Sequence, residues 1–273
     1  MRARVDWRKV RRAVIGLVVL ALLYGIVAEV GARVLPRRVW IAVHDIQDVE
    51  LVPPYASLAE EAVFLVRSGI LPGGVVVSGL RVLGGLVLGA ALGIPLGFAT
   101  ASARPFGYLV EPWVVFFRFT PALALLPLFV LWFGFGEASK ILLIAAGVAV
   151  VTLQGAFDGV RGVPRVYLDA AASLGARRRD VVGRVVLPAA LPDIVASLRI
   201  ATGLAWVTLV VAELVAPAMP SLGYLLALSG AYPRVPTIVV ALATIGTLVL
   251  VSDAIALTAY HRATAWKRRR SVG

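Results

Sequence analysis

Long runs of residues without a charged side chain constrain this chain more than any other feature. Several of them reach the roughly 20 apolar residues that a helix needs to cross a hydrocarbon core about 30 Å thick. A backbone surrounded by lipid must satisfy its own hydrogen bonds, so we expect these runs to be helical. The runs are Ala13–Ala28, Val82–Ala103, Phe119–Gly136, Ile141–Phe157, Leu214–Pro233 and Val235–Ser252. The sequence therefore predicts an all-α integral membrane protein.

Six transmembrane helices are predicted from these runs and their flanks. They cover Ala13–Val30, Val75–Thr100, Val114–Phe133, Ile141–Phe157, Leu191–Ala216 and Val235–Tyr260. Arginine and lysine gather in three clusters next to the spans, and such clusters mark the cytoplasmic side of a membrane. The clusters are Arg2, Arg4, Arg8, Lys9, Arg11 and Arg12; Arg161, Arg165, Arg177, Arg178, Arg179 and Arg184; and Arg262, Lys267, Arg268, Arg269 and Arg270. Because both termini are basic, the number of spans should be even.

The net charge of +12 admits two interpretations, nucleic-acid binding and membrane topology. No aromatic–basic interleaving or nucleic-acid-binding motif accompanies the charge, so we favour topology and expect no nucleic acid partner. Both termini and the segment Asp158–Ala190 are then cytoplasmic in a multi-pass protein of the plasma (inner) membrane. The segment Gly31–Gly74 is predicted on the other side although it carries four arginines.

The chain divides into three predicted parts. Residues 1–74 comprise a cytoplasmic tail, the first span and an extracytoplasmic segment, residues 75–260 form the core domain with a cytoplasmic loop at 158–190, and residues 261–273 are a basic cytoplasmic tail. In the first part, Ser57–Val66 is predicted as an interfacial helix, with Ser57 as its N-cap and Glu60 completing a capping box. In the second predicted span, Gly85, Gly89, Gly93 and Gly97 recur every four residues. Such a ridge lets a neighbouring helix approach closely.

The cytoplasmic loop between Pro164 and Pro192 predicts two short helices joined by a corner. Pro164 fits the first position of a helix, and the apolar side chains of Val166, Ala170 and Leu174 share one face. Gly175 follows where a helix end favours a residue that tolerates positive φ. A second helix is predicted from Arg177 to Leu187, with Pro188 ending it. A unit this small is too short to be a domain, so we expect it to serve a contact.

Seven residues in this loop follow a fixed spacing. The pattern is an acid and two alanines, three residues, a glycine, nine residues, an aliphatic residue, one residue, and Leu-Pro. It is carried by Asp169, Ala170, Ala171, Gly175, Val185, Leu187 and Pro188. This spacing resembles the EAA signature of ABC importer permeases, with Asp in place of the usual Glu. Segments similar to the branch that serves sulfonates, nitrate and taurine are Thr120–Ile144, Leu198–Ala216 and Leu222–Leu226.

The resemblance implies a type I ABC importer permease fold with six transmembrane helices. It also implies that the loop forms coupling helices, which dock on an ATPase subunit. The chain itself lacks the GxxxxGK[ST] phosphate-binding motif, so a separate ATPase must supply the energy. Because each chain has one such loop and a channel needs two permeases, we expect a homodimer with two ATPase subunits. An extracytoplasmic binding protein would deliver a small solute, which the resemblance makes a sulfonate-, nitrate- or taurine-like anion.

Charged residues in or near the spans are candidates for the translocation path, because charge inside lipid is costly. They are Arg81, Arg118, Arg199, Glu213 and Asp253. We expect Glu213 and Arg118 to line the path or its gate.

Other classes of membrane protein remain alternatives. A secondary transporter would show repeated halves and midplane ion-binding groups, an exporter subunit would lack the EAA-like loop, and an importer for another small organic solute would share it. The chain has no cysteine, and its two histidines lie outside the spans. An intramembrane enzyme needs a nucleophile with a base, or paired carboxylates. We therefore expect no catalytic residue, cofactor or metal.

Overall fold

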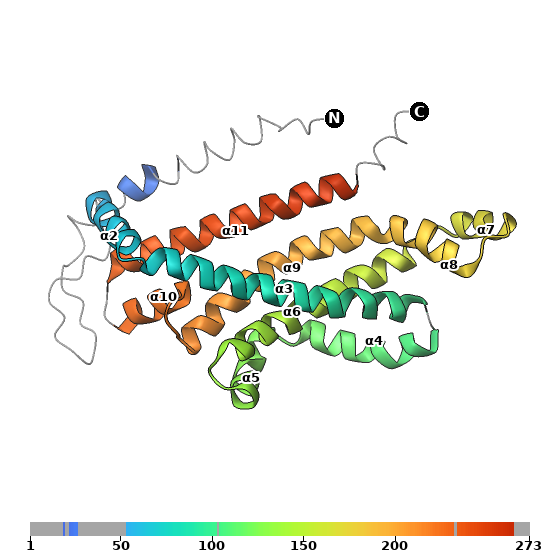
Figure 1. The fold of residues 1–273 in the computed structure, drawn as a ribbon, viewed down its shortest axis with the longest axis horizontal. Helices are drawn as coiled ribbons and strands as arrows, with labels where there is room; N and C mark the ends of the chain where they lie inside the picture. The colour runs from blue at the N-terminus through green and yellow to red at the C-terminus, as the bar shows by residue number, and fades with distance from the viewer. Residues whose placement is uncertain (1–18, 20–21, 27–52, 103, 232–233, 265–273) are drawn as a thin grey trace. The chain divides into compact units, whose positions relative to one another are not determined.

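The computed structural model describes residues 19, 22–26, 53–102, 104–231 and 234–264. This part of the chain is almost entirely helical (Figure 1). The elements are α2 (Tyr55–Arg67), α3 (Ile70–Ser102), α4 (Arg104–Phe119), η1 (Ala122–Leu125), α5 (Leu126–Phe133), α6 (Glu137–Arg161), α7 (Arg165–Ser173), α8 (Arg178–Val181), η2 (Val182–Val186), α9 (Leu187–Val215), α10 (Leu222–Ala231) and α11 (Val235–Ala263).

Four helical segments within the described residues are long and apolar enough to cross a membrane. They are Ile70–Ser102, Glu137–Arg161, Arg178–Val215 and Val235–Ala263. They correspond to the second, fourth, fifth and sixth predicted spans, each extended by several residues at one or both ends. The first predicted span lies outside the described residues except at residue 19 and residues 22–26, which are helical. The count of six spans therefore stays a prediction.

The third predicted span is not one straight helix. α4 ends at Phe119, and the segments Gly107–Phe117 and Ala122–Phe133 meet at an angle of 90°. The cause is local, because Pro121 disfavours the helical conformation at the residue before it. Its own backbone is extended, with φ −60° and ψ 120°. If the pair is counted as one broken span, the described residues hold five candidate spans.

The glycine ridge of α3 packs directly on α6, as its spacing predicts. A Cβ at Gly89 would lie 2.6 Å from the carbonyl oxygen of Ala145, and one at Gly93 would overlap Thr152 and Ala149. At Gly97 the overlap would be with the carbonyl oxygen of Leu153. These backbones touch because the glycines carry no side chain.

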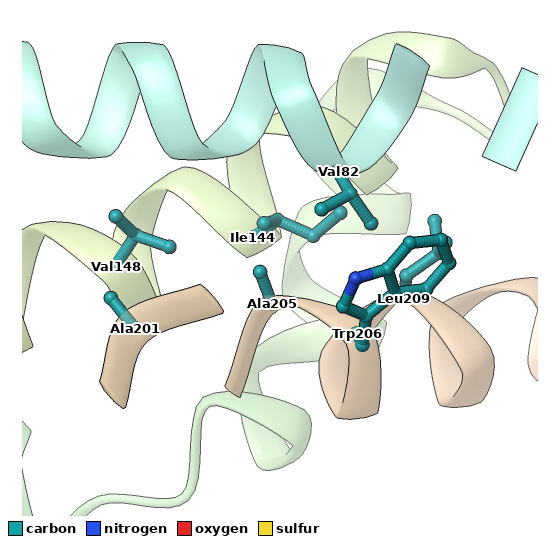
Figure 2. Close-up of a cluster of buried hydrophobic side chains, with 7 residues drawn as sticks. All are labelled: Val82, Ile144, Val148, Ala201, Ala205, Trp206 and Leu209. Atoms are coloured by element: carbon teal, nitrogen blue, oxygen red, sulfur yellow. The ribbon is translucent and has the colours of Figure 1, made fainter. Parts of the chain in front are cut away.

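A hydrophobic cluster joins α3, α6 and α9 (Figure 2). Small and large side chains interlock there, with Ala201 and Ala205 leaving room for Ile144 and Val148. Trp206 is buried among them, and its indole nitrogen donates a hydrogen bond to Ser252 of α11 at 3.1 Å. The cluster holds α6 and α9 side by side along their lengths (Figure 1).

The described residues fall into two compact units. One comprises residues up to Leu71 together with Leu225–Ala243, and the other comprises Pro72–Tyr224 with the residues from Thr244 onward. The larger unit holds α6, α9 and the loop between them.

In the smaller unit, α2 confirms a helix near the predicted place but not its cap. The helix begins at Tyr55 after Pro54, and no side chain caps it. The Ser57 hydroxyl instead donates back to the Pro54 carbonyl oxygen at 3.0 Å, so the predicted N-cap and capping box are wrong. Glu61, about two turns after the start of α2, accepts a hydrogen bond from Thr237 of α11 at 2.6 Å.

Candidate functional site

The loop between α6 and α9 turns back on itself at Gly175. This residue has φ +69°, so the predicted left-handed corner is confirmed. The amide of Gly175 donates to the Ala172 carbonyl at 2.9 Å, and the amide of Ala176 donates to the Ala171 carbonyl at 3.0 Å. These two bonds form a Schellman motif, which satisfies the last carbonyls of α7. The corner is therefore a rigid turn whose backbone needs a residue without a Cβ.

An apolar stripe on α7 is exposed at this corner. Leu174 is 87% exposed and Val166 is 65% exposed, and Ala170 between them is exposed as well. Asp169 is exposed beside the stripe, whereas Ala171 is buried on the inner face. The tip of the loop therefore carries apolar side chains that no described residue covers.

The second short helix of the loop does not end where proline was expected to end it. α8 begins at Arg178, one turn of π-helix follows at Val182–Val186, and the chain continues without a break into α9. Pro188 lies in the first turn of α9, directly after the wider π turn, where its missing N–H is tolerated. Pro164 likewise precedes α7 rather than opening it. Val185 is half-buried, and Leu187 and Pro188 are exposed.

Exposed arginines flank the corner on the α8 side. They are Arg177, Arg178, Arg179 and Arg184. Only Arg184 is paired among them within the described residues, at 3.6 Å from Asp180 and largely in solvent. A pair so exposed contributes little to stability, so these guanidinium groups are available to a partner.

A groove of about 1000 Å³ runs from the middle of the larger unit toward the end that carries this loop. Its walls come from the end of α4, the bend at η1, α5, α6 and α9. The lining is mostly apolar and includes three aromatic rings, of Phe117, Phe129 and Trp132. Its polar side chains are Thr120, Gln154, Asp158, Asp193 and Ser197.

The two carboxylates of the groove lie near the loop end of α6 and α9. Asp158 accepts a hydrogen bond from the Gln154 amide at 2.9 Å. Neither Asp158 nor Asp193 forms an ion pair with any residue that the structure describes, and both are exposed. The groove therefore carries negative charge near the loop end of these two helices.

A buried network of charges lies at the opposite end of the same unit. Arg81 of α3 is 2% exposed, and its guanidinium contacts two carboxylates. It donates to Glu213 of α9 at 2.6 Å and forms two hydrogen bonds with Glu137, the first residue of α6. Glu213 is fully buried, whereas the Glu137 side chain is 57% exposed. The network ties three helices together at one point.

Glu213 also fixes the start of α10. Its carboxylate accepts hydrogen bonds from the backbone amide of Gly223 at 2.8 Å and from the Ser78 hydroxyl at 2.9 Å. The Ser78 oxygen in turn accepts from the amide of Leu222 at 3.1 Å. These amides belong to the first turn of a helix, where orphan N–H groups favour an acceptor with negative charge. α10 itself has no counterpart among the predicted helices.

Lys140 is the exceptional member of this region. It is fully buried on α6, three residues after Glu137, yet its Nζ atom has no hydrogen-bond partner. Thr208 of α9 is also buried with an unpaired hydroxyl. A buried ammonium without a hydrogen bond is costly, so this position invites a mutational test.

The remaining charged residues of the spans fall elsewhere. Arg199 of α9 donates two hydrogen bonds to Asp253 of α11, at 2.6 and 2.8 Å, and both side chains are about half exposed. Arg118 lies near the end of α4, two residues before Thr120 of the groove, and its side chain is outside the described part of the chain. Glu213, the other residue predicted for the path, lies in the buried network and not on the groove.

Sequence reasoning found the loop but missed the partners of the network. Ser78, Glu137 and Lys140 carried no signal of their own, since pairing across helices depends on helix register. No sequence pattern predicted that the carboxylates of Asp158 and Asp193 share a groove, because these residues come from different helices. A residue spacing could have placed Asp158 and Gln154 on one face of a helix, four residues apart.

Comparisons with known proteins show the family of this chain. A family described as binding-protein-dependent transport system inner membrane component matches residues 93–264. A probable ABC transporter permease protein of Brucella abortus (strain 2308) is 40% identical over 80% of this chain and 87% of its own length. The taurine transport system permease protein TauC of Escherichia coli (strain K12) is 37% identical over 68% of this chain and 67% of its own. A putative aliphatic sulfonates transport permease protein, SsuC of Bacillus subtilis (strain 168), is 41% identical over 55% and 54%.

Solved structures share the arrangement of helices. The methionine ABC transporter MetNI in an inward-facing conformation aligns with a TM-score of 0.64 at 20% identity, over 71% of this chain and 96% of that one. An amino acid ABC transporter aligns with a TM-score of 0.61 at 15% identity, over 78% and 100%. At such identities the likeness shows the fold alone.

Proposed function

We propose that two copies of this chain form a translocation path through the membrane. The chain belongs to the family of inner membrane components of binding-protein-dependent transport systems and is the permease subunit of an ABC importer. It has the all-α fold of type I importer permeases, works with an ATPase and a solute-binding protein, and is not itself an enzyme. Each copy engages one ATPase subunit through the loop at 158–190.

The uncovered stripe at the Gly175 corner is the observation that carries this proposal. Leu174 and Val166 expose apolar surface that no described residue covers. The rigid Schellman turn holds that surface in one orientation, and the nearby arginines add positive charge. We assign Asp169, Ala170, Ala171 and Gly175 to this docking unit, with Val185, Leu187 and Pro188 joining it to α9.

The orientation proposed for the chain places this loop and both termini in the cytoplasm. The basic clusters support it, since lysine and arginine resist translocation. Cysteine labelling tests the orientation without background because the chain has no native cysteine. In intact cells, Met219→Cys at the opposite end, where Met219 is 59% exposed, should react with an impermeant thiol reagent. Ser271→Cys should react only after permeabilisation, and reaction before it would contradict the orientation.

The proposal of two copies of this chain is supported by the open groove and by the single coupling loop in each chain. The groove is open along one side, so one chain alone does not enclose a path through the membrane. A second copy facing it would close the path and would bring a second loop for a second ATPase. We propose that Arg118, next to the groove in sequence, lines the path, and that Glu213 holds its outer gate through α10.

The solute proposed is a small sulfonate-, nitrate- or taurine-like anion. The support comes from the two relatives named for taurine and for aliphatic sulfonates, which are 37% and 41% identical to this chain. The alternative is another small organic solute carried by the same architecture. Competition by taurine, ethanesulfonate and nitrate for uptake into proteoliposomes, in the presence of the binding protein, separates the two. Absence of competition by all three would contradict the solute class and leave the importer in place.

Native mass measurement of the purified complex tests the assembly. We expect two copies of this chain with two ATPase subunits. A stable, transport-competent complex with a single copy would overturn the homodimer. Leu174→Asp should lower recovery of the ATPase without loss of permease, because its side chain is 87% exposed and touches no core. Unchanged recovery would mean that the apolar stripe does not dock the ATPase.

A further inference from the structure

The geometry of the groove points to a solute that carries a positively charged amine, and we infer that Asp158 and Asp193 select for it. This inference rests on the proposed function, because it takes the groove as part of the translocation path. It narrows the proposed solute class to zwitterions, which carry an acid group and also present an ammonium group to the two carboxylates. Among sulfonates, it favours an aminosulfonate over an alkanesulfonate.

The groove is large and open enough for such a solute. Its volume of about 1000 Å³ exceeds that of any small organic ion, and it reaches from the bend after α4 to the loop end of the unit. Ile200 of α9 is 67% exposed and lies on its wall, so the middle of the groove is accessible. A solute that crosses the membrane here must pass both carboxylates before it leaves.

The charges on the described walls have one sign. Asp158 and Asp193 are the only ionisable residues among the described lining side chains. Two arginines near the groove whose side chains the structure describes have other contacts: the Arg161 guanidinium lies 4.5 Å from the Phe157 ring centroid, and Arg199 is paired with Asp253. A cleft lined by one sign of charge concentrates ions of the other sign. The ammonium of an aminosulfonate would be attracted here, and a plain sulfonate lacks that group.

The aromatic rings add a second means of recognising a cation. Phe117, Phe129 and Trp132 lie on the same groove, and the Trp132 side chain is 62% exposed. The face of an aromatic ring attracts an ammonium group, tryptophan most strongly. Gln154 holds the Asp158 carboxylate through its amide, which leaves the other carboxylate oxygen for a ligand. The rings and the carboxylates of one groove would thus both attract the ammonium group of the solute.

Thiol modification measures this preference without requiring transport. Ile200→Cys in the purified permease–ATPase complex is treated at low salt with two methanethiosulfonate reagents of similar size, one ending in trimethylammonium and one in sulfonate. The mass shift of this chain gives each rate. Met219→Cys, exposed at the opposite end, gives the intrinsic ratio of the two reagents. We expect the cationic reagent to be favoured at Ile200→Cys by about tenfold or more over that ratio.

Neutralising the carboxylates provides the decisive comparison. Asp158→Asn and Asp193→Asn, combined with Ile200→Cys, should return the ratio to the intrinsic value. A ratio at Ile200→Cys equal to that at Met219→Cys would overturn the inference, and so would a high ratio that survives both substitutions. Failure of both reagents to react would show that the groove is closed to aqueous solutes, which also overturns it. None of these outcomes decides the proposed importer assembly. That proposal is tested separately, by the mass of the complex and by the docking variant Leu174→Asp.

Discussion

The Arg81 guanidinium of α3 and the Glu213 carboxylate of α9 meet at 2.6 Å inside the helical bundle, although 132 residues separate them in the chain. Arg81 is 2% exposed and Glu213 is fully buried. Such a pair is stable only because further hydrogen bonds satisfy both groups. Ser78, Glu137 and the amide of Gly223 supply them. The start of α10 is thereby tied to the helices that form the core.

Removal of the Glu213 carboxylate should be strongly destabilising. Glu213→Ala leaves Arg81, Ser78 and the Gly223 amide without their buried acceptor, and breaking a buried pair in this way costs about 3–5 kcal/mol. The measurement is the midpoint of thermal unfolding of the purified permease, followed by tryptophan fluorescence. Glu137→Ala is the matched control, because it removes the other carboxylate of Arg81 from a side chain that is 57% exposed. Equal midpoints for the wild type and Glu213→Ala would contradict the role assigned to this network.

Removal of the Lys140 charge should not destabilise the protein. Its buried ammonium forms no hydrogen bond, and an unsatisfied buried polar group costs about 1–3 kcal/mol. Lys140→Met keeps the length of the side chain and removes the charge, so the unfolding midpoint should stay the same or rise. Arg81→Met, which removes a cation with several partners, should lower it. If Lys140→Met proves as damaging as Arg81→Met, the ammonium has a partner that this conformation does not reveal.

The glycine ridge of α3 gives a prediction with an internal control. Gly93→Ala would place a methyl group against Thr152 and the Ala149 carbonyl, and overpacking of this kind costs about 1–3 kcal/mol. Gly79, on the same helix, has no atom within 4 Å of its Cβ position. Gly79→Ala should therefore be neutral or slightly stabilising, because alanine favours the helix. Recovery of monodisperse protein after heating should rank Gly79→Ala above Gly93→Ala, and the reverse order would mean that α3 and α6 do not pack here.

Local patterns in the sequence predicted the features that depend on neighbouring residues. The apolar runs placed four spans, and the position of Gly175 after the stripe of α7 predicted its positive φ. The errors concern two prolines, whose effect on a helix depends on the structure around them. Pro188 was expected to end a helix. It instead lies in the first turn of α9, directly after the π turn at Val182–Val186, where its missing N–H is tolerated, and the helix continues. The break at Pro121 was missed because the run around it is uniformly apolar.

Features that depend on the register between helices could not be predicted in this way. Arg81, Glu137 and Glu213 lie on three helices, and no spacing along the chain shows that they meet. The same holds for the two carboxylates of the groove, which come from α6 and α9. A resemblance to a family could place the loop, because its seven residues are close in sequence. It could not place a groove whose walls come from four helical segments and the bend between them.

The corner at Gly175 offers the sharpest test of coupling between this loop and the ATPase. Gly175 has φ +69° and open space at its Cβ position, so a side chain there meets no clash, only an unfavourable backbone conformation. That conformation costs a residue with a Cβ about 1–2 kcal/mol. Gly175→Val should thus open the Schellman turn and turn the stripe of α7 away from its partner. Insertion and yield should be largely unaffected because no spanning helix changes.

Uptake and recovery of the ATPase, each normalised to the permease in the membrane, are the measurements for Gly175→Val. Both should be lost or strongly reduced. Gly183→Val is the matched control, since Gly183 lies in the same loop, also has open space at its Cβ position, and has no positive φ. Asp169→Glu should be tolerated, because it keeps the carboxylate beside the stripe, whereas Asp169→Lys reverses the charge and should resemble Gly175→Val. Full uptake by Gly175→Val at normal levels would show that this corner does not transmit ATP hydrolysis to the path.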